Sequence, residues 1–450
     1  MSQLQFLYSQ EQLKTIATEI INRSLQLGAS GAQVEISESI STDIEILEQK
    51  IENFETSHEN QILLTVYNGK QKGHLGISNI EINNLDTLIN QALDIAKYTQ
   101  PDQANGILDK RFLSNNDTED LDLYHPYVID NASLIAEAME IESLALGQNK
   151  LITASDGSSI SLTTYNFVTA NSNGFNQDYK TSRYSNSVSI IGNTKKNGMQ
   201  TDYWYSSARS YTDLLKADRL AQIAAKRLLN RLNAGSFKAQ TCRVIFESNI
   251  AKSIIGSLIS ALSGSALYRK LSFLNDSLGT VILPTWLSIE ENPFILRGLS
   301  SCYFDNEGGR VHKRKIINEG KVEGYLLSAY SARKMGLSPT GNAGGAHNLL
   351  VSSNFSGNLE ELAREMRNGL IITETIGHGL NSVTGDYSVG ASGLVVIDGN
   401  ISHFADNLTI SGNMRDIFKN IIYIANDSTP GSINCGSMLI EQGWLQIAAK

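Results

Sequence analysis

The sequence of 450 residues is poor in several residue types that restrict what kind of protein it can be. It contains only three cysteines, Cys242, Cys302 and Cys435, and they lie far apart. An odd and widely spaced set argues against a disulfide framework and indicates a reducing compartment, so we expect a cytoplasmic protein. Only 6 prolines interrupt the chain, and 36 glycines accompany them. This composition suits sheets that are joined by turns.

Long apolar runs and excess positive charge are missing as well. No stretch approaches the roughly 20 apolar residues of a transmembrane helix, and the N-terminus lacks the pattern of a secretory signal. The chain has 37 Lys and Arg against 46 Asp and Glu, a formal net charge of −9. Such a chain has no long-range attraction for phosphate backbones. We therefore expect neither a membrane nor a nucleic acid as a direct partner.

Histidine never occurs in a metal-ligand pattern, although one stretch comes close. The 7 histidines form no H-x-x-x-H or H-x-x-E-H pair. The segment TETIGHGL, residues 373–380, would read H-E-x-x-x-H if Thr373 were histidine. Its β-branched residues and glycines are poor helix formers, so we predict that His378 lies at a strand end or in a turn. The patterns G-x-S-x-G and G-x-G-x-x-G and the P-loop are also absent, which removes the common acyl-transfer and nucleotide sites.

The distribution of helical and strand-like patterns predicts an α+β fold. At roughly 150 residues per domain, the length indicates two or three domains. Strand-like alternation fills the stretches between helices, and Asn68-Gly69 is a hairpin signal. Helical periodicity in the first half covers 9–27, 85–98, 132–146 and 211–232.

These patterns divide the chain into three parts. We expect an N-terminal α+β domain over 1–105, a second α+β segment over 126–235 and a mainly β C-terminal domain over 240–450. Short strands with regular turns make a sandwich or barrel-like sheet the expectation for the last part. Helical periodicity returns there at 249–262 and 358–366.

Two glycine-rich turns stand out in the last part, TGNAGGAHN (340–348) and TGDYSVGASG (384–393). Glycine permits positive φ and the close approach of another backbone. A groove that takes an extended peptide by strand addition would need such backbone. Tight turns at the ends of a barrel would need it equally, so both interpretations stay open.

Four stretches together resemble the PmbA/TldD family, and specifically its PmbA (TldE) branch. They are SALYRKLSFLNDSLG (265–279), SAYSARKMGLSPTGNAGGAHN (328–348), TGDYSVGASG (384–393) and NCGSMLI (434–440). The resemblance covers nearly the whole chain. It implies a cytoplasmic protease of two related subunits, in which the TldD-type subunit holds zinc through an H-E-x-x-x-H helix and a downstream cysteine. The family is linked to trimming a peptide antibiotic precursor, to degrading an antitoxin and to the historical name modulator of DNA gyrase.

The resemblance also implies what this chain does not do. The helix that corresponds to the metal motif is 247–264, and it contains no histidine. Cys435 occupies the place of the metal-binding cysteine, but without the histidine pair no catalytic role carries over to it. We therefore expect no catalytic residue and no metal on this chain, with zinc on the TldD-type partner. His347, Asp386, Tyr387 and Cys435 are candidate residues of the cleft.

Three functions follow as hypotheses. The first is the non-metal subunit of a heterodimeric metallopeptidase, inactive alone, which shapes a cleft for unfolded or extended peptides. The second is a homodimeric peptide-binding or regulatory protein without protease activity, and a homodimer is also an alternative when the partner is missing. The third is a self-sufficient hydrolase with an unrecognised site around His347, Asp386 and Cys435.

Overall fold

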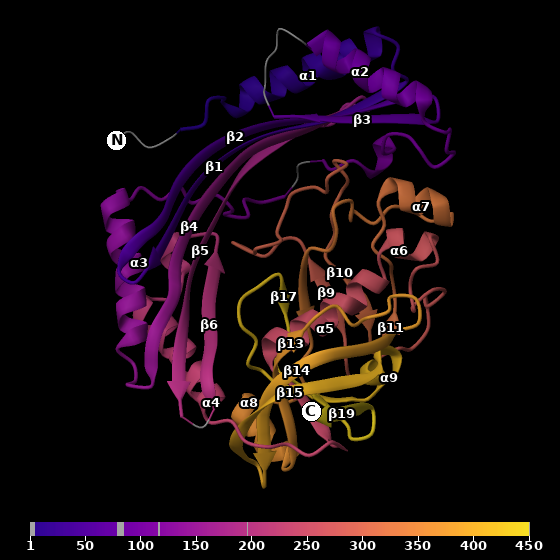
Figure 1. The fold of residues 1–450 in the computed structure, drawn as a ribbon. Coiled ribbons are helices and arrows are strands. Elements are labelled where there is room, and N and C mark those ends of the chain that lie inside the picture. Colours follow the sequence, from indigo (N-terminus) through magenta and orange to yellow (C-terminus); the bar gives the residue numbers. More distant parts are fainter. Residues whose placement is uncertain (1–4, 79–84, 116–117, 196, 450) are drawn as a thin grey trace.

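A long curved sheet and a mainly β region make up the protein (Figure 1). The computed structural model describes residues 5–78, 85–115, 118–195 and 197–449. In Figure 1 the sheet arches around the C-terminal region, which fills its concave side, while helices cover the convex side. The α+β class that the sequence predicts is confirmed. No helix within the described ranges has the length and apolar character of a membrane span.

The curved sheet has six antiparallel strands in the order β3-β2-β1-β4-β5-β6. The alternation of buried and less buried residues along its central strand is that of a sheet with one face on a core. The hairpin predicted at Asn68-Gly69 is confirmed, with Gly69 at a φ of 61° between β2 and β3. The strands are β1 (Gly31–Leu47), β2 (Lys50–Asn68), β3 (Gln71–Ile77), β4 (Ile152–Asn171), β5 (Asn176–Thr194) and β6 (Gly198–Ala208).

Pairing of β1 with β4 joins strands from the first and second sequence segments into this one sheet. The register runs from Gln33 opposite Asn171 to Ile46 opposite Ser158. The strands of 1–105 and of 126–235 therefore share one hydrogen-bonded layer, although each segment supplies its own helices.

Four helices cover the convex face in two pairs, and each pair has its own apolar core against the sheet. Ser9 caps the first helix in a capping box with Gln12, which explains where the helix begins. They are α1 (Gln10–Gln26), α2 (Leu85–Tyr98), α3 (Asn131–Leu146) and α4 (Ala217–Leu232).

The start of α4 differs from the predicted helix 211–232. Residues Tyr211–Asp213 form a 3-10 turn instead, and the helix begins only at Ala217. The Tyr211 ring lies 4.2 Å from the ring of Tyr127 and is 9% exposed. The apolar spacing at Tyr211 therefore reflects burial in the core and not a helical turn, so the prediction was wrong at this end.

The C-terminal region contains two sheets and short helices, which confirms the prediction of a mainly β part. The eight-stranded sheet consists of β7 (Gln240–Thr241), β8 (Arg243–Phe246), β13 (Gly369–Ile376), β14 (Asp386–Ile397), β15 (Asn400–Asn413), β16 (Ile421–Ile424), β18 (Met438–Ile440) and β19 (Leu445–Ala449). The five-stranded sheet consists of β9 (Ile289–Asn292), β10 (Arg314–Asn318), β11 (Lys321–Val322), β12 (Asn348–Val351) and β17 (Ile433–Asn434). The helices are α5 (Ser248–Ala261), α6 (Gly264–Tyr268), α7 (Ala329–Met335), α8 (Leu359–Met366) and α9 (Met414–Lys419), and a 3-10 turn at Lys110–Phe112 lies before the second segment.

Helix α5 is the central element of this region. It contacts β8 and β13 of the larger sheet and β17 of the smaller one, and it contributes to the core that both sheets share. Its apolar residues Ile254, Ile255 and Leu258 are almost completely buried. Burial of one face fixes the rotation of the helix, so its polar face must point elsewhere.

Candidate functional site: the cleft between the curved sheet and helix α5

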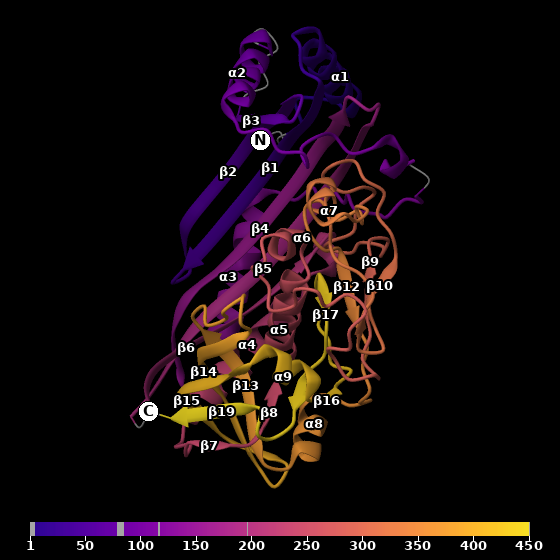
Figure 2. The same cartoon turned by 90° about the vertical axis from the view of Figure 1, so that its right-hand side faces the viewer.

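A cavity of about 880 Å³ lies between the edge of the curved sheet and the C-terminal region. The second half of β6 and the start of α4 form one wall, and α5 with the loops 295–299 and 429–434 forms the other. Figure 2 shows α5 next to β17. Clefts between two structural units are common sites for ligands, so we take this cavity, called here the cleft, as the candidate site.

Helix α5 turns its polar face to the cleft. Asn249, Lys252, Ser253 and Gly256 line the cavity, at the three- and four-residue spacing of one helical face. The sequence predicts a helix here, but nothing in the family resemblance points to Lys252. A polar stripe on an otherwise apolar helix was the available signal for it.

Lys252 is held by Thr429, in the loop that forms the same wall of the cleft as α5. Its Nζ donates to the carbonyl oxygen of Thr429 at 2.8 Å and also to the hydroxyl of Thr429. Burial lowers the pKa of the Lys252 ammonium, and the nearby Cys435 and Asp427 oppose this shift. The helix therefore offers an amine to the cleft where a metallopeptidase would need imidazoles.

Cys435 lies directly behind the cleft wall and is completely buried. Its Sγ donates to the carbonyl of Gly436 at 3.4 Å, and its own carbonyl accepts a hydrogen bond of 2.8 Å from the Ser248 hydroxyl. Burial raises the pKa of the Cys435 thiol to about 12. Because the thiolate is the form that binds metal or attacks a substrate, this residue is a packed thiol.

His347 precedes Asn348, which lines the cleft, but its ring is engaged elsewhere. Its Nε2 lies 2.8 Å from the carbonyl of Gly341, and its Nδ1 lies 3.3 Å from Sγ of Cys302. A carbonyl accepts only, so Nε2 carries the proton and Nδ1 accepts from the thiol. Burial raises the pKa of Cys302 to about 12. The His347 ring therefore bonds to Cys302 and to the backbone of its own loop, and neither side chain lines the cleft.

Asp386 and Tyr387 lie at the start of β14. Asp386 is exposed and bonds to the Thr384 hydroxyl at 2.7 Å and to the Asn413 amide at 3.0 Å. Tyr387 belongs to the apolar core, where burial raises its pKa to about 12. Neither residue lines the cleft. Across the described ranges, no hydrogen bond or ion pair joins two side chains of the set His347, Asp386, Tyr387 and Cys435.

The structure also shows which secondary structure the segment TETIGHGL (373–380) adopts. Strand β13 ends at Ile376, and His378 lies exposed in the turn that follows it. The prediction of a strand end or turn is confirmed. Within the part of the chain that the structure describes, no group of three or more His, Cys, Asp and Glu side chains is placed to hold a metal ion.

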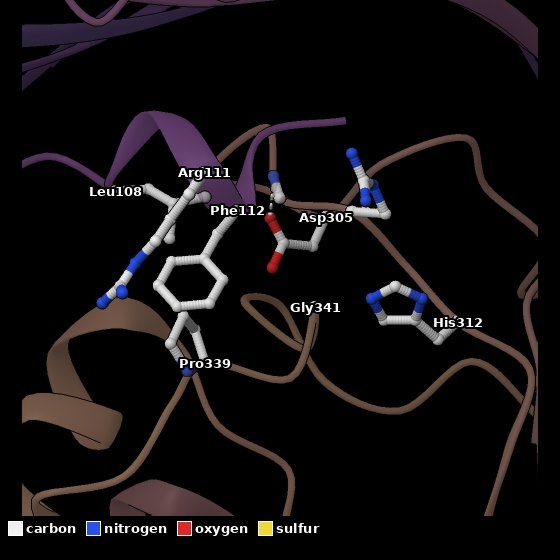
Figure 3. A pocket seen from close by; sticks show the side chains of 9 residues that line it. Leu108, Arg111, Phe112, Asp305, His312, Pro339 and Gly341 are labelled. Carbon is white, nitrogen blue, oxygen red and sulfur yellow. Dashed lines mark hydrogen bonds between the residues drawn. The ribbon is translucent and has the colours of Figure 1, made fainter. Parts of the chain in front are cut away.

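Another cavity, of about 100 Å³, is lined in part by Asp305 (Figure 3). Figure 3 shows the Asp305 side chain between Phe112 and Pro339 on one side and His312 on the other. Its oxygens accept backbone N–H groups, including that of Gly309 at 2.7 Å. Burial raises the pKa of Asp305, and these backbone hydrogen bonds oppose the shift. The carboxylate thus stabilises the turn around it.

Comparison with known proteins agrees with this architecture. Residues 124–232 match the model of the PmbA/TldA metallopeptidase central domain, and residues 239–444 match that of the C-terminal domain. This chain belongs to the PmbA/TldD family. It is 38% identical to the metalloprotease PmbA homolog of Haemophilus influenzae over 434 residues, with 96% of each chain covered. It is 37% identical to the metalloprotease PmbA of Escherichia coli O157:H7 over 437 residues, again with 96% of each covered.

Solved structures have the same fold. A protein from Bacteroides thetaiotaomicron that carries the designation modulator of DNA gyrase superposes with a TM-score of 0.91 at 25% identity, covering 97% of this chain and 99% of the other. TldE from Thermococcus kodakarensis superposes with a TM-score of 0.82 at 17% identity, covering 96% and 100%. The family resemblance that the sequence indicates is therefore confirmed.

The metallopeptidase family implies a metal, and the cleft residues do not fit one. The face of α5 that lines the cleft carries an ammonium group, an amide and a hydroxyl. Zinc in a peptidase requires imidazole and carboxylate ligands, and a neighbouring ammonium repels a divalent cation. The Cys435 thiol, with its pKa raised to about 12 by burial, is no better as a ligand. No step of hydrolysis is therefore assigned to a metal on this chain.

Proposed function

We propose that this chain is the non-metal subunit of a two-subunit metallopeptidase and that it shapes the cleft in which an extended peptide is held. One observation carries the proposal: α5, the helix that corresponds to the metal motif of the family, faces the cleft with Asn249, Lys252, Ser253 and Gly256. Hydrolysis would be performed by the zinc and glutamate of a TldD-type partner. The assembly would be a cytoplasmic heterodimer.

The shape of the cleft supports a peptide as the ligand. Strand β6 is an edge strand of the curved sheet, and residues Trp204 to Ala208 of this strand line the cavity. An edge strand presents unpaired backbone N–H and C=O groups, which an extended peptide can pair with by strand addition. Recognition through main-chain hydrogen bonds suits substrates of varied sequence.

Reconstitution tests the proposal. The full-length chain, the TldD-type subunit of the same organism and their equimolar mixture are each incubated with an unstructured peptide, and zinc is measured in each preparation. We expect cleavage by the mixture, a stable complex in size-exclusion chromatography, and zinc in the partner. A partner that carries Gln in place of the motif glutamate is the matched control, and its mixture should be inactive.

The other outcomes are equally informative. Cleavage by the chain alone, with stoichiometric zinc, would overturn the proposal and favour the self-sufficient hydrolase. Peptide binding by a homodimer that forms no complex with the partner would favour the regulatory protein.

A further inference from the structure

The cleft has the opposite charge from the rest of the chain. The whole sequence has a formal net charge of −9. The cleft lining contains one acidic side chain, Asp213, and five basic ones: Arg183, Arg209, Arg219, Lys252 and Arg297. A cavity with one sign of charge concentrates ligands of the other sign. The distribution therefore points to an anionic ligand.

Arg209 is the strongest evidence, because it is a buried cation without a carboxylate partner among the described residues. It is 9% exposed, and its guanidinium donates only to carbonyl oxygens: Ser182 at 3.2 Å, Gly298 at 3.3 Å and Leu299 at 2.9 Å. These bonds use three of the five N–H groups of a guanidinium, which leaves two N–H groups for a ligand. Burial lowers the pKa of Arg209, as expected when no anion compensates the desolvation. Buried charges are normally paired, so this position is incomplete without an anion.

Two further arginines add positive charge to the side of the cleft on which Arg209 lies. Arg219 and Arg183 are exposed at the cleft. Arg183 makes one weak contact of 3.4 Å with the Ser207 hydroxyl, and Arg219 makes no side-chain hydrogen bond or ion pair with the rest of the described chain. Asp213 does not offset them, because it is bonded to Arg297 at 3.2 Å. Arg297 is also bonded to Asp122 at 2.6 Å, so it adds no positive charge of its own to the cleft. The wall of the cleft that β6 and α4 form therefore keeps its positive charge.

We infer that the cleft selects extended peptides that carry carboxylates, so that acidic segments are the preferred substrates. The inference rests on the proposed function for its ligand, a peptide, and adds the chemistry of that peptide. Arg209, Arg219 and Arg183 would bind the carboxylates while the edge of β6 pairs with the peptide backbone. Phosphate backbones also carry negative charge, but they lack the N–H and C=O groups that the edge of β6 would pair with.

Binding of matched peptides to the full-length chain tests this inference. The first probe is a 12-residue unstructured peptide with four Glu, acetylated and amidated and labelled with an uncharged dye. The second has Gln at these four positions, and the third is the Gln peptide with a free C-terminal carboxylate. The fourth is a labelled oligo-dT of similar length. Fluorescence anisotropy is measured at about 50 mM and about 300 mM salt.

We expect the Glu peptide to bind about fivefold or more tightly than its Gln twin at low salt, and this ratio to shrink at high salt. Stronger binding of the third peptide than of the second assigns the terminal carboxylate to the site, whereas a preference of the Glu peptide alone assigns side-chain carboxylates. Equal binding of Glu and Gln peptides overturns the inference. Tighter binding of oligo-dT than of the Glu peptide overturns the assignment to a peptide.

Charge-matched variants separate the cleft from the net charge of the protein. Arg219→Gln and Arg183→Gln should each weaken the Glu peptide about two- to fivefold and leave the Gln peptide unchanged. Arg364→Gln removes the same charge from the exposed face of α8, outside the cleft, and should change neither. An equal effect of Arg364→Gln would contradict a site in the cleft. Arg209→Gln should have the largest effect, with thermal unfolding as the check that it still folds.

The two proposals fail in different ways. If the mixture with the TldD-type subunit cleaves Glu and Gln peptides at the same rate, the carboxylate preference is wrong while the subunit role stands. If the mixture cleaves nothing but the chain binds the Glu peptide selectively, the subunit role is wrong while the preference stands.

Discussion

Helix α4 carries arginines of two kinds, and the comparison shows what decides the role of a charged residue. Arg219 lies in the first turn of α4 and lines the cleft, and it has no acidic partner among the described residues. Arg227 and Arg231, farther along, are paired: Arg227 bonds to Asp202 at 3.0 Å and to Glu247 at 2.9 Å. Arg231 bonds to Asp202 at 2.8 Å and to Glu374.

The paired arginines connect the two parts of the molecule. Asp202 belongs to β6 of the curved sheet, whereas Glu247 and Glu374 belong to the C-terminal region. An arginine on α4 therefore stabilises the fold where carboxylates surround it. Where they are missing, it is available to bind a ligand. The position of the acidic residues decides between these roles.

The largest effect is expected for Arg227→Ala. Removing this guanidinium leaves the carboxylates of Asp202 and Glu247 facing one another with less compensation, and it removes the cation from its place 5.1 Å from the Trp204 ring. Breaking one side of a buried ion pair costs about 3–5 kcal/mol, so the free energy of unfolding should fall by that amount. Urea titration followed by circular dichroism measures it. A loss of unfolding free energy below about 1 kcal/mol would show that the ion pairs of Arg227 do not stabilise the fold.

A smaller effect is expected for Glu307→Gln, which replaces a carboxylate that forms no ion pair with the described residues. Burial and the nearby Asp305 raise its pKa from 4.5 to about 7, opposed by the N–H of Ala329. Because the folded state binds the proton more tightly, Glu307 stabilises the fold below pH 4.5 and loses this contribution as the pH rises to about 7. The variant should lose this slope and gain about 1–3 kcal/mol relative to the native chain at pH 7. Urea titrations at several pH values test it, with the exposed Glu52→Gln as control, and an unchanged slope would contradict it.

Lys252→Met should change the stability only slightly. The variant removes a partly buried ammonium but leaves the Thr429 carbonyl without its donor, so the two effects offset each other within about 1 kcal/mol. Burial lowers the pKa of Lys252 in the folded state, so its contribution is present above pH 10.5 and is lost as the pH falls. The variant should therefore show a flatter rise of stability towards alkaline pH. Thermal unfolding between pH 7 and pH 10 measures this, and a steeper rise in the variant would contradict the direction of the shift.

Arg219→Ala should have the smallest effect on the fold. The side chain is exposed and makes no ion pair with the described part of the chain, and such positions change the free energy of unfolding by about 0.5 kcal/mol or less. Measured beside Arg227→Ala under the same conditions, it gives the direct contrast between the two kinds of arginine. A loss comparable to that of Arg227→Ala would remove the distinction.

Much of the fold can be predicted from the sequence, because its elements are long and periodic. Helix α2 agrees with the predicted range 85–98 at both ends, and the alternation along β1 predicts a half-buried strand. The pairing of β1 with β4 could not be predicted, because register between distant strands depends on tertiary packing and not on local pattern. The same limit explains Tyr211, whose ring packs against Tyr127 in a turn that resembles a helix start in the sequence.

Less of the candidate site than of the fold could be predicted from the sequence. The resemblance points to the helix 247–264, and α5 indeed lines the cleft. It gives no reason to select Arg209 or Lys252, because their roles depend on which partners they lack or find across the fold. Arg209 meets Gly298 and Leu299, about ninety positions away in the chain. Only the three-dimensional arrangement shows that Arg209 has no carboxylate partner in the part of the chain that the structure describes.

The pairing of β1 with β4 also has a consequence for how the chain is synthesised. Gln33 pairs with Asn171, so the centre of the curved sheet closes a loop of well over a hundred residues. Contacts between distant residues form slowly, because the entropy of closing the loop opposes them. Until β4 has left the ribosome, β1 has one edge open along its whole length, and an open edge pairs readily with other chains. A chain that ends before Ile152 should therefore be prone to aggregation.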